Sequence, residues 1–450
     1  MVRMDKPVKL EMMGLHGFVG ENFATAGDEG ENTPVARRVS YPPGRYGNLP
    51  YPTNLRRAEM IGSAMDTPEH SEVAVDPQRQ EQAREYARIR HRLLLVDLLI
   101  SFALVIGFLA TGASRAYREF IVNLGIVSPW VQVAVYVGTL GLAYTLLFLP
   151  LSWYRSYVLP HRYGLSTQTL RGWWMDWFKM LGLEVLLGFP IVELIFWLLR
   201  THSQSWWIWA SILMVALSVV LGYIFPVLIL PIFYKLTPLE DKELRRRIEM
   251  LAGRTGVEVA GVYTINLSSR TRAANAVVMG MGRTKRIALG DTLYEEFTPA
   301  EIETILAHEL AHQVHHDVEI GMVVQALVTV ASLYLAHIFL RWGVRAFDLQ
   351  GPGDVAALPL LALAMGLFSL LLMPLTNGYS RWRERLADRF ALWVTGRPEA
   401  FADAMTRLAN QNLSELEPPP WVVWLLYDHP PLHQRVQMAR TWSGDRGSPG

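Results

Sequence analysis

Six stretches of the sequence are apolar enough and long enough to cross a lipid bilayer as helices. A helix needs about 20 mostly apolar residues to span roughly 30 Å of hydrocarbon. Stretches of this kind lie at residues 93–112, 130–153, 180–199, 206–231, 320–340 and 355–375. Buried helices of a soluble protein would rarely recur at this length, so the pattern predicts a membrane protein with about six spans.

Between the fourth and fifth stretches the pattern changes to short elements. Residues 239–253 have a helical spacing of apolar positions, and short strands are predicted at 257–265, 274–279 and 286–289. Another helix is predicted to begin at Thr298, because Thr298 and Glu301 form a Thr-x-x-Glu capping box around Pro299. The segment therefore predicts a small α/β unit inserted between membrane spans.

The spans divide the chain into six predicted segments. Residues 1–82 are rich in Pro and Gly and have no sustained apolar period, which is typical of a disordered polar tail. The remaining segments are four spans within 83–231, a catalytic α/β segment at 232–318, two spans within 319–376, a C-terminal catalytic segment at 377–442 and a flexible tail at 443–450.

The composition is that of a membrane protein, and it limits the expected partners and the possible metal ligands. The chain is 51% hydrophobic and 18% charged, which is richer in apolar residues than an ordinary soluble protein. Its formal net charge of +1 gives no basic field to attract nucleic acid, so no nucleic-acid partner is expected. With no cysteine, any metal must be bound by histidine and carboxylate side chains.

The distribution of arginine predicts which segments face the cytoplasm. Arginines cluster before the first span and after the second, at positions 84, 88, 90, 92, 155, 162 and 171. By the positive-inside rule both segments are cytoplasmic, and counting onward places residues 234–317 and the chain after the sixth span on the same side. Arg341 and Arg345, between the fifth and sixth spans, lie on the opposite side and weaken this pattern.

Four ionisable residues fall within the predicted spans: Asp97, Glu184, Glu193 and His337. A charge facing lipid would cost a few kcal/mol, so these side chains are expected to face the bundle interior or water. Pairing with one another or contact with a water-filled cavity would explain them as well as a catalytic role does.

The strongest chemical signal is His308-Glu309-Leu310-Ala311-His312, an H-E-x-x-H pattern on the capped helix. Residues four apart lie on one helix face, so both imidazoles can bind one zinc ion. Glu309 is displaced around the helix, where it can act as general base toward water at the metal. The fold class predicted is mostly α: a transmembrane bundle of about six helices with an inserted small α/β unit of the zincin (gluzincin) type.

The third metal ligand must come from elsewhere in the chain. A metzincin extension would need Gly at 315 and His at 318, whereas the sequence has His315 and Val318. Glu384 and Asp388 stand four apart on a helical pattern, so one could bind zinc while the other orients a ligand imidazole. Two spans separate this segment from the zinc motif and return it to the same membrane face. A solvated helix with incidental Arg–Glu pairs is the alternative.

Several further motifs occur in order along the chain. They are "HRYGLSTQT", "LPIFYKLTPLEDKEL", "RTRAANAVVMG", "KRIALGDTLY", the H-E-x-x-H helix, "NGYSRWRERLADRFA" and "DHPPLHQRV". Over residues 93–440 the sequence resembles the membrane CaaX prenyl protease type 1 family, the a-factor-converting zinc proteases, and is similar to a bacterial member. Eukaryotic members are described with seven spans, whereas six are counted here, and we expect the missing span to be the most N-terminal one.

The resemblance implies a role for each matching residue. Glu384 corresponds to the third ligand of one zinc ion per chain, and Asp388 to an aspartate that supports a ligand histidine. His429 and Arg435 correspond to an active-site pair that steadies the oxyanion and its surroundings. Without the resemblance, His429 could equally cap the turn before two prolines.

The resemblance also implies a substrate-binding strand. Asn275, followed by Ala276, corresponds to the position that aligns the substrate backbone. An edge strand beside a metal can bind an extended peptide by backbone pairing, with little dependence on side chains. His315 and His316 lie one turn beyond the second zinc histidine and are expected to face solvent or a carboxylate such as Asp317, not the metal.

The sequence therefore predicts a zinc-dependent endopeptidase, with membrane-associated or CaaX-type peptides, prenylated ones included, as substrates and the lipid bilayer as its surroundings. A bacterial inner membrane with the zinc site on the cytoplasmic side is the expected location. An HtpX-like quality-control protease is the nearest alternative. A site-2 type protease fits less well, because polar residues flank the motif. A catalytically silent zinc-binding scaffold would not need Glu309.

Overall fold

The computed structural model describes residues 73–280 and 285–443. The described residues from Ala74 onward belong to one structural unit. In this part of the chain six helical segments are long and apolar enough to span a membrane, which confirms the count from the hydrophobic pattern. They are Pro77–Ala110, Pro129–Arg162, Leu170–Thr201, Trp206–Phe233, Asp317–Ala346 and Val355–Thr395.

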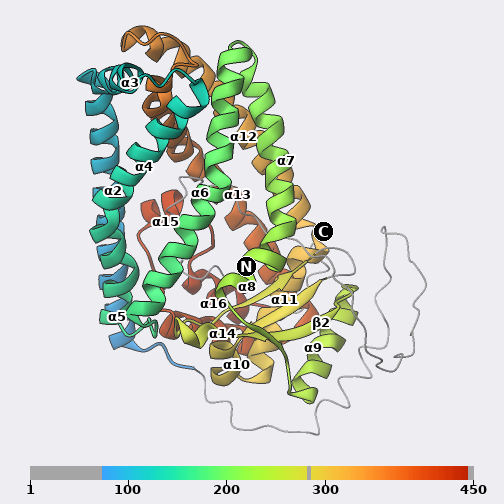
Figure 1. The fold of residues 1–450 in the computed structure, drawn as a ribbon. Helices are drawn as coiled ribbons and strands as arrows, with labels where there is room; N and C mark the ends of the chain where they lie inside the picture. The colour runs from blue at the N-terminus through green and yellow to red at the C-terminus, as the bar shows by residue number, and fades with distance from the viewer. Residues whose placement is uncertain (1–72, 281–284, 444–450) are drawn as a thin grey trace, which may run out of the picture. The chain divides into compact units, whose positions relative to one another are not determined.

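In Figure 1 these spans carry the labels α2, α4 with α5, α6, α7 with α8, α12 and α13. The first and third are α2 (Pro77–Ala110) and α6 (Leu170–Thr201), and the fifth is α12 (Asp317–Ala346). The second span consists of α4 (Pro129–Trp153), a π-helical turn (Tyr154–Val158) and α5 (Leu159–Arg162). The fourth consists of α7 (Trp206–Ile224), a π-helical turn (Phe225–Ile229) and α8 (Leu230–Phe233). The sixth consists of a 3-10 turn (Val355–Ala357) and α13 (Leu358–Thr395).

The helices extend beyond the apolar stretches that predicted them. The α2 helix begins at Pro77, where the Asp76 side chain accepts hydrogen bonds from the backbone amides of Gln78 and Arg79. Residues 77–82, which we predicted as part of the disordered tail, are therefore helical, and that boundary was wrong. The rest of the predicted tail up to residue 72, and residues 444–450, lie outside the described residues.

A small four-stranded sheet follows the fourth span, as the change of pattern predicted. Its strands are β1 (Leu236–Pro238), β2 (Gly261–Ile265), β3 (Ala276–Met279) and β4 (Arg286–Gly290), in the order β1-β2-β4-β3. The β2–β4 pair is parallel, and the other two pairs are antiparallel. This order leaves β3 at one edge of the sheet, which the site uses.

Helices cover this sheet and form its core with it. They are α9 (Lys242–Thr255), α10 (Asp291–Glu296) and α11 (Pro299–Val314). The α9 helix begins and ends later than the predicted 239–253, because Asp241 caps its start and Gly256, with φ of 73°, ends it. The capping box of α11 is confirmed: Thr298 and Glu301 each accept a hydrogen bond from the backbone amide of the other.

The C-terminal segment returns to this sheet and its helices. Three helices complete it, α14 (Pro398–Gln411), α15 (Pro420–Leu426) and α16 (Leu432–Arg440). The α14 and α16 helices lie beside α11 at the end of the bundle that carries the sheet, while α3 (Ala113–Asn123) lies at the other end (Figure 1). Buried residues of the sheet, α9, α11, α13 and α14 form one hydrophobic cluster. The long helix α13 therefore belongs both to the membrane bundle and to the catalytic end.

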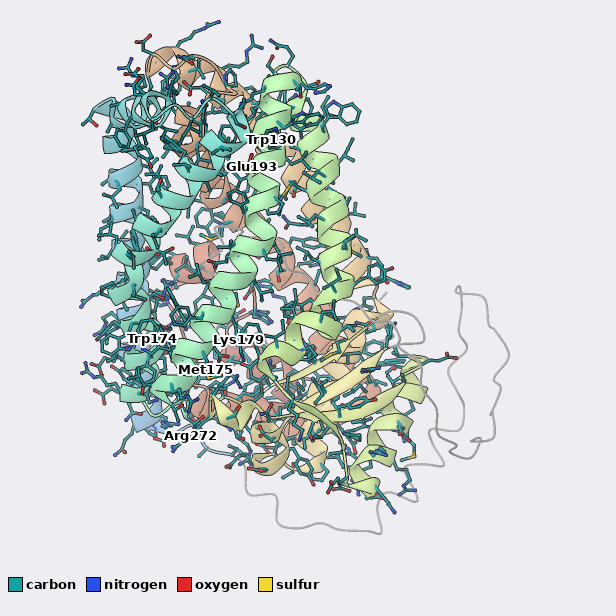
Figure 2. The ribbon with its side chains drawn as sticks, viewed as in Figure 1. Trp130, Trp174, Met175, Lys179, Glu193 and Arg272 are labelled. Atoms are coloured by element: carbon teal, nitrogen blue, oxygen red, sulfur yellow. The ribbon has the colours of Figure 1, made fainter. Side chains whose placement is uncertain are left out.

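The ionisable residues inside the spans are partly paired. Asp97 lies 3.7 Å from Arg155, and Nε1 of Trp206 donates to Nδ1 of His337 at 3.0 Å. Glu193 is buried on α6 (Figure 2). Figure 2 also places Trp130 and Trp174 near opposite ends of the bundle, where membrane proteins concentrate tryptophan.

Candidate metal centre

The two histidines of the motif face one another across one turn of α11. Their Nε2 atoms are 3.3 Å apart, and the rings meet edge to face. His308 is 1% exposed, and Glu309 between them is 3% exposed. The spacing of four residues accounts for this geometry, because it returns the side chain to nearly the same face of the helix.

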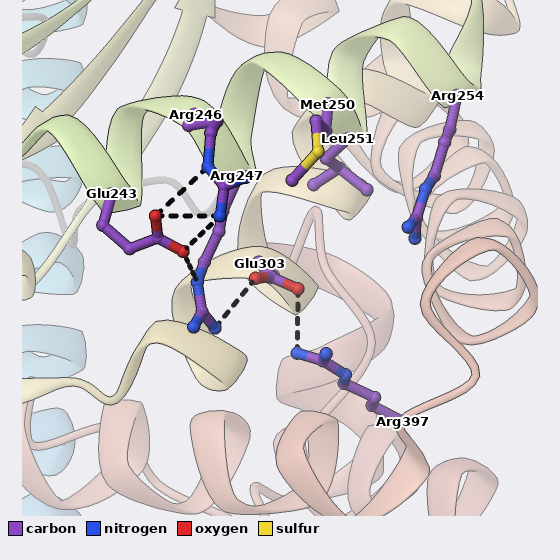
Figure 3. Close-up of a pocket in the computed structure, with 8 residues that line it drawn as sticks. All are labelled: Glu243, Arg246, Arg247, Met250, Leu251, Arg254, Glu303 and Arg397. Carbon is purple, nitrogen blue, oxygen red and sulfur yellow. Dashed lines mark hydrogen bonds and ion pairs between the residues drawn. The ribbon is translucent and has the colours of Figure 1, made fainter. Parts of the chain in front are cut away.

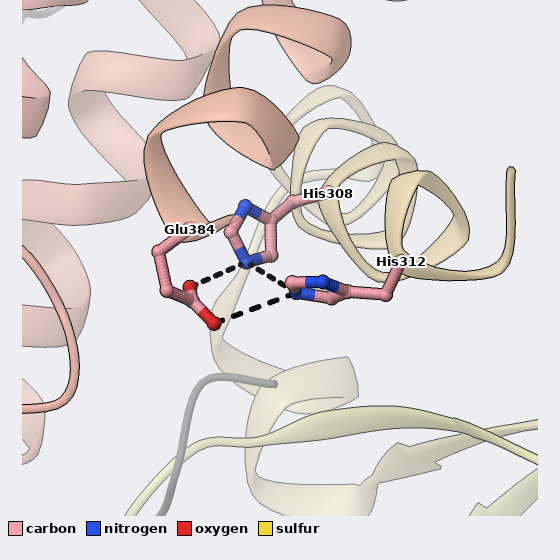
Figure 4. Close-up of side chains that lie close together, drawn as sticks. All are labelled: His308, His312 and Glu384. Atoms are coloured by element: carbon pink, nitrogen blue, oxygen red, sulfur yellow. Dashed lines mark hydrogen bonds and ion pairs between the residues drawn. The ribbon is translucent and has the colours of Figure 1, made fainter. Parts of the chain in front are cut away.

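Glu384 of α13 completes a group of three candidate ligands, as Figure 4 shows. Its carboxylate oxygens lie 3.1 Å from Nε2 of His308 and 3.6 Å from Nε2 of His312. One ligand atom from each of the three residues lies within 4.8 Å of the others. The buried Oε2 of Glu384 receives no well-formed hydrogen bond from any residue that the structure describes.

The opposite ring nitrogens are held by carboxylates. Nδ1 of His308 is 2.8 Å from Asp388, and Nδ1 of His312 is 2.7 Å from Asp317. An ionised carboxylate only accepts hydrogen bonds, so each Nδ1 donates and each neutral ring keeps a lone pair on Nε2. Two nitrogen lone pairs and a carboxylate then converge on one point, which suits a cation, and two His with one Glu is a donor set of catalytic zinc.

An arginine holds each of these carboxylates. Arg435 donates to the two oxygens of Asp388 at 2.9 and 2.5 Å, and both residues are almost fully buried. Arg383 donates through Nε to Asp317 at 2.5 Å and also contacts it through Nη2. The two candidate ligand histidines thus have matching supports, each made of a carboxylate and a guanidinium.

Carboxylates raise the pKa of two histidines at this point, His308 and His429, whereas burial lowers the pKa of His312. Burial lowers the pKa of His308, but the Asp388 and Glu384 carboxylates outweigh burial and the pKa is raised. Burial likewise lowers the pKa of His429, and Glu384 and Asp428 reverse the effect, so that pKa is raised too. A metal ion can supply the charge that the carboxylates favour here.

Comparison with known proteins decides the family. Residues 58–235 match the profile of the CAAX prenyl protease N-terminal region, described as five membrane helices, and residues 238–443 match that of peptidase family M48. A protein of Bacillus subtilis called uncharacterized metalloprotease YhfN is 33% identical over 371 residues, which is 81% of this chain and 86% of that protein. The chain belongs to peptidase family M48.

Other M48 relatives agree in sequence and in fold. CAAX prenyl protease 1 of Saccharomyces cerevisiae is 30% identical over 334 residues, covering 70% of this chain and 73% of the yeast protein. The crystal structure of S. mikatae Ste24p has a TM-score of 0.73 and 25% identity, and the match covers 86% of this chain and 95% of that one. The chain is therefore a metalloprotease of the membrane, homologous to CAAX prenyl protease 1, and the resemblance stated from the motifs is confirmed.

The other predicted site residues of this M48 chain lie around the three candidate ligands. His429, in the loop after α15, places Nε2 3.3 Å from Glu384, while Nδ1 binds Asp428 at 2.9 Å. Arg435 stands behind His308 and holds Asp388, so it acts through that carboxylate. These contacts indicate that Arg435 positions His308 through Asp388. The resemblance implied a different role for it, as the partner of His429 at the oxyanion.

The predicted substrate strand is the edge strand β3, which packs against α11. Asn275 directly precedes β3, and its buried Oδ1 has no hydrogen-bond partner among the described residues. Its backbone carbonyl accepts from the amide of Gly290 at 2.8 Å. Ala276 is buried in the core.

Sequence reasoning missed the support of the second histidine. Asp317 had been considered only as a neighbour of His315 and His316, and Arg383 had no role. In the structure His315 packs on Phe390 and His316 points outward near Glu319, so neither belongs to the metal group. The available signal was the position of Asp317, five residues after His312 at the start of the next helix.

Proposed function

We propose that this M48 peptidase is a zinc-dependent endopeptidase that binds one zinc ion through His308, His312 and Glu384. The observation that supports it most is the meeting of two histidine Nε2 atoms with the carboxylate of Glu384, whose buried Oε2 receives no well-formed hydrogen bond from the described residues. Zinc bound there would lower the pKa of a coordinated water toward about 7 and polarise the scissile carbonyl.

Glu309 is the general base of the proposed reaction. It lies between the two histidines on α11, is nearly fully buried, and interacts electrostatically with both of them. We assign it the transfer of a proton from the attacking water to the leaving amine. Glu384 and Asp428 outweigh the effect of burial and raise the pKa of His429, which favours a ring whose Nε2 donates a hydrogen bond to the developing oxyanion.

The proposed substrate is a peptide bound in extended form along β3. The unpartnered Oδ1 of Asn275 is placed to accept a hydrogen bond from its backbone. CAAX prenyl protease 1 is the name of several relatives, which supports membrane-associated peptides, including prenylated CaaX-type tails, as substrates. The Bacillus relative supports a bacterial cell membrane as the location, and the arginine distribution supports a zinc site on its cytoplasmic side.

Removal of the metal is the direct test of this proposal. Detergent-purified protein is expected to cleave quenched fluorescent peptides, to lose cleavage to the background level with 1,10-phenanthroline, and to regain it when zinc is restored. The panel should contain farnesylated and unmodified versions of one peptide. Cleavage that continues after zinc is stripped would refute metal dependence, and bound zinc without any cleavage would favour the silent scaffold. Equal cleavage of both versions would favour quality control.

Asp317 gives a second prediction, because it orients the ligand His312. Asp317→Asn is expected to weaken zinc affinity about 10- to 100-fold, since partners of metal ligands have effects of this size. Competition with a zinc-sensitive dye measures the affinity. Activity at saturating zinc should recover most of the wild-type value, because the ligands and Glu309 are intact.

The matched control is Glu319→Gln, which removes a charge from the first turn of the same helix at an exposed position. It should leave zinc affinity unchanged. Arg383→Gln should resemble Asp317→Asn, because Arg383 binds that carboxylate. Unchanged affinity in both of these variants would remove the positioning role.

A further inference from the structure

The end of the bundle opposite the metal centre carries a pocket of about 440 Å³ beside the last turns of α12. It is lined by Arg341, Trp342, Arg345 and Ala346, all of them exposed. The two arginines are those that weaken the positive-inside pattern, and nothing in the proteolytic mechanism uses them. Their presence on this side of the membrane needs a physical reason.

The other arginines at this end have partners. The connections between spans here contain five arginines and no lysine. Arg115 binds Asp348 at 2.5 Å, Arg118 lies 3.9 Å from Asp354, and Arg200 donates to the carbonyl of Gly353 at 3.1 Å. Among the described residues Arg341 has only a 3.4 Å contact with Gln204, and Arg345 has no carboxylate partner. Two arginines that form no ion pair with a described carboxylate therefore line the pocket.

An exposed apolar stripe leads along α12 to these arginines. Val323, Leu327, Val330, Tyr334 and Ile338 follow one another at intervals of three or four residues, and all are exposed. The same spacing continues to Arg341 and Arg345. Residues at these intervals share one helix face, so an apolar surface for an acyl chain leads directly to two guanidinium groups.

The depth along the helix matches a lipid headgroup. The 21 residues of 320–340 rise about 30 Å, the thickness of the hydrocarbon core, so Arg341 lies just beyond it. Asp317, which supports the metal ligand, is 24 residues earlier, or about 36 Å away along the axis. Trp342, 58% exposed, lies at the level where tryptophan prefers to sit in a bilayer.

We propose that Arg341 and Arg345 bind the phosphate of one anionic phospholipid, whose acyl chain lies along the exposed stripe of α12. Guanidinium groups form strong paired hydrogen bonds with phosphate oxygens. A net negative headgroup is preferred over a zwitterionic one, because the choline cation of the latter would be repelled by the two unpaired arginines. Free phosphate would gain nothing from the stripe or from Trp342.

A second arginine-rich pocket, of about 240 Å³ between α9, α11 and α14, shows the contrast (Figure 3). Its arginines are largely neutralised within the pocket. Glu243 binds Arg246 and Arg247, and Glu303 binds Arg397 at 2.8 Å. A cluster of arginines alone therefore does not define the proposed site. The site is defined by the absence of an ion pair at Arg341 and Arg345 among the described residues, together with the adjoining apolar stripe.

Native mass spectrometry of the delipidated full chain in detergent tests the proposal. Wild type is expected to retain one phosphatidylglycerol at least about tenfold more tightly than phosphatidylcholine. Arg341→Gln/Arg345→Gln should lose this preference, and Arg341→Lys/Arg345→Lys should keep most of it. The matched control, Arg246→Gln/Arg254→Gln, removes the same charge from α9 and should behave as wild type.

Several outcomes would overturn the proposal. Equal retention of phosphatidylglycerol and phosphatidylcholine by the wild-type protein would overturn it. This comparison needs no variant, so it does not depend on whether a variant folds. The proposal is also overturned if the preference for phosphatidylglycerol survives the double Gln substitution, or if the α9 control loses that preference to the same extent. Displacement of the lipid by millimolar glycerol phosphate would assign the pocket to free phosphate instead.

Discussion

Glu309→Gln is expected to reduce peptide cleavage by about 10³-fold or more while leaving one zinc bound per chain. General-base catalysis contributes about 10²- to 10⁴-fold, and the amide of Gln cannot take a proton from water. Glu309 is not among the three candidate ligands, so metal binding does not depend on it. Turnover of a fluorescent peptide, with zinc content measured on the same sample, tests both parts.

The control for this prediction is Glu303→Gln, the same substitution on the same helix. Glu303 is engaged with Arg397 and Arg247 away from the metal group, so cleavage should stay within about twofold of wild type. A Glu309→Gln variant that retains zinc and cleaves at the wild-type rate would remove Glu309 from the mechanism. Loss of zinc together with activity would instead assign Glu309 to metal binding.

The parts of the fold that depend on local sequence could be predicted. A capping box involves residues three apart, so the start of α11 was readable at Thr298. Membrane spans were readable because hydropathy acts over about 20 residues. The ends of α2 and α13 were not, since helices continue into water where caps and packing stabilise them. Asp76, which caps α2, lies well before the first apolar run.

In the metal site, too, local sequence predicts some residues and not others. His308 and His312 are four apart on one helix, so their meeting follows from helix geometry. Glu384 could be placed on the same membrane face but not beside the histidines, and the family resemblance supplied that step. The Arg383–Asp317 ion pair joins residues 66 positions apart through the packing of α13 on α12. No periodicity encodes such a pair, which explains why it was missed.

Glu384→Gln is expected to have the other large effect, loss of zinc and of cleavage together. The neutral amide is a weak metal ligand, and the two histidines alone leave one of the three protein positions of a catalytic zinc site unfilled. We expect less than about a tenth of a zinc per chain after dialysis, and cleavage at background level. Zinc analysis and peptide turnover on one preparation measure both.

Comparison of Glu384→Gln with Glu309→Gln distinguishes a metal ligand from a general base. Both variants replace a buried Glu by Gln within the same site, yet one should retain zinc and the other should lose it. Glu399→Gln, an exposed position on α14 directly after α13, controls for loss of charge nearby and should change neither quantity. A Glu384→Gln protein that keeps full zinc and cleaves peptide would require another third ligand. His429 would then be tested first, because its Nε2 lies 3.3 Å from Glu384.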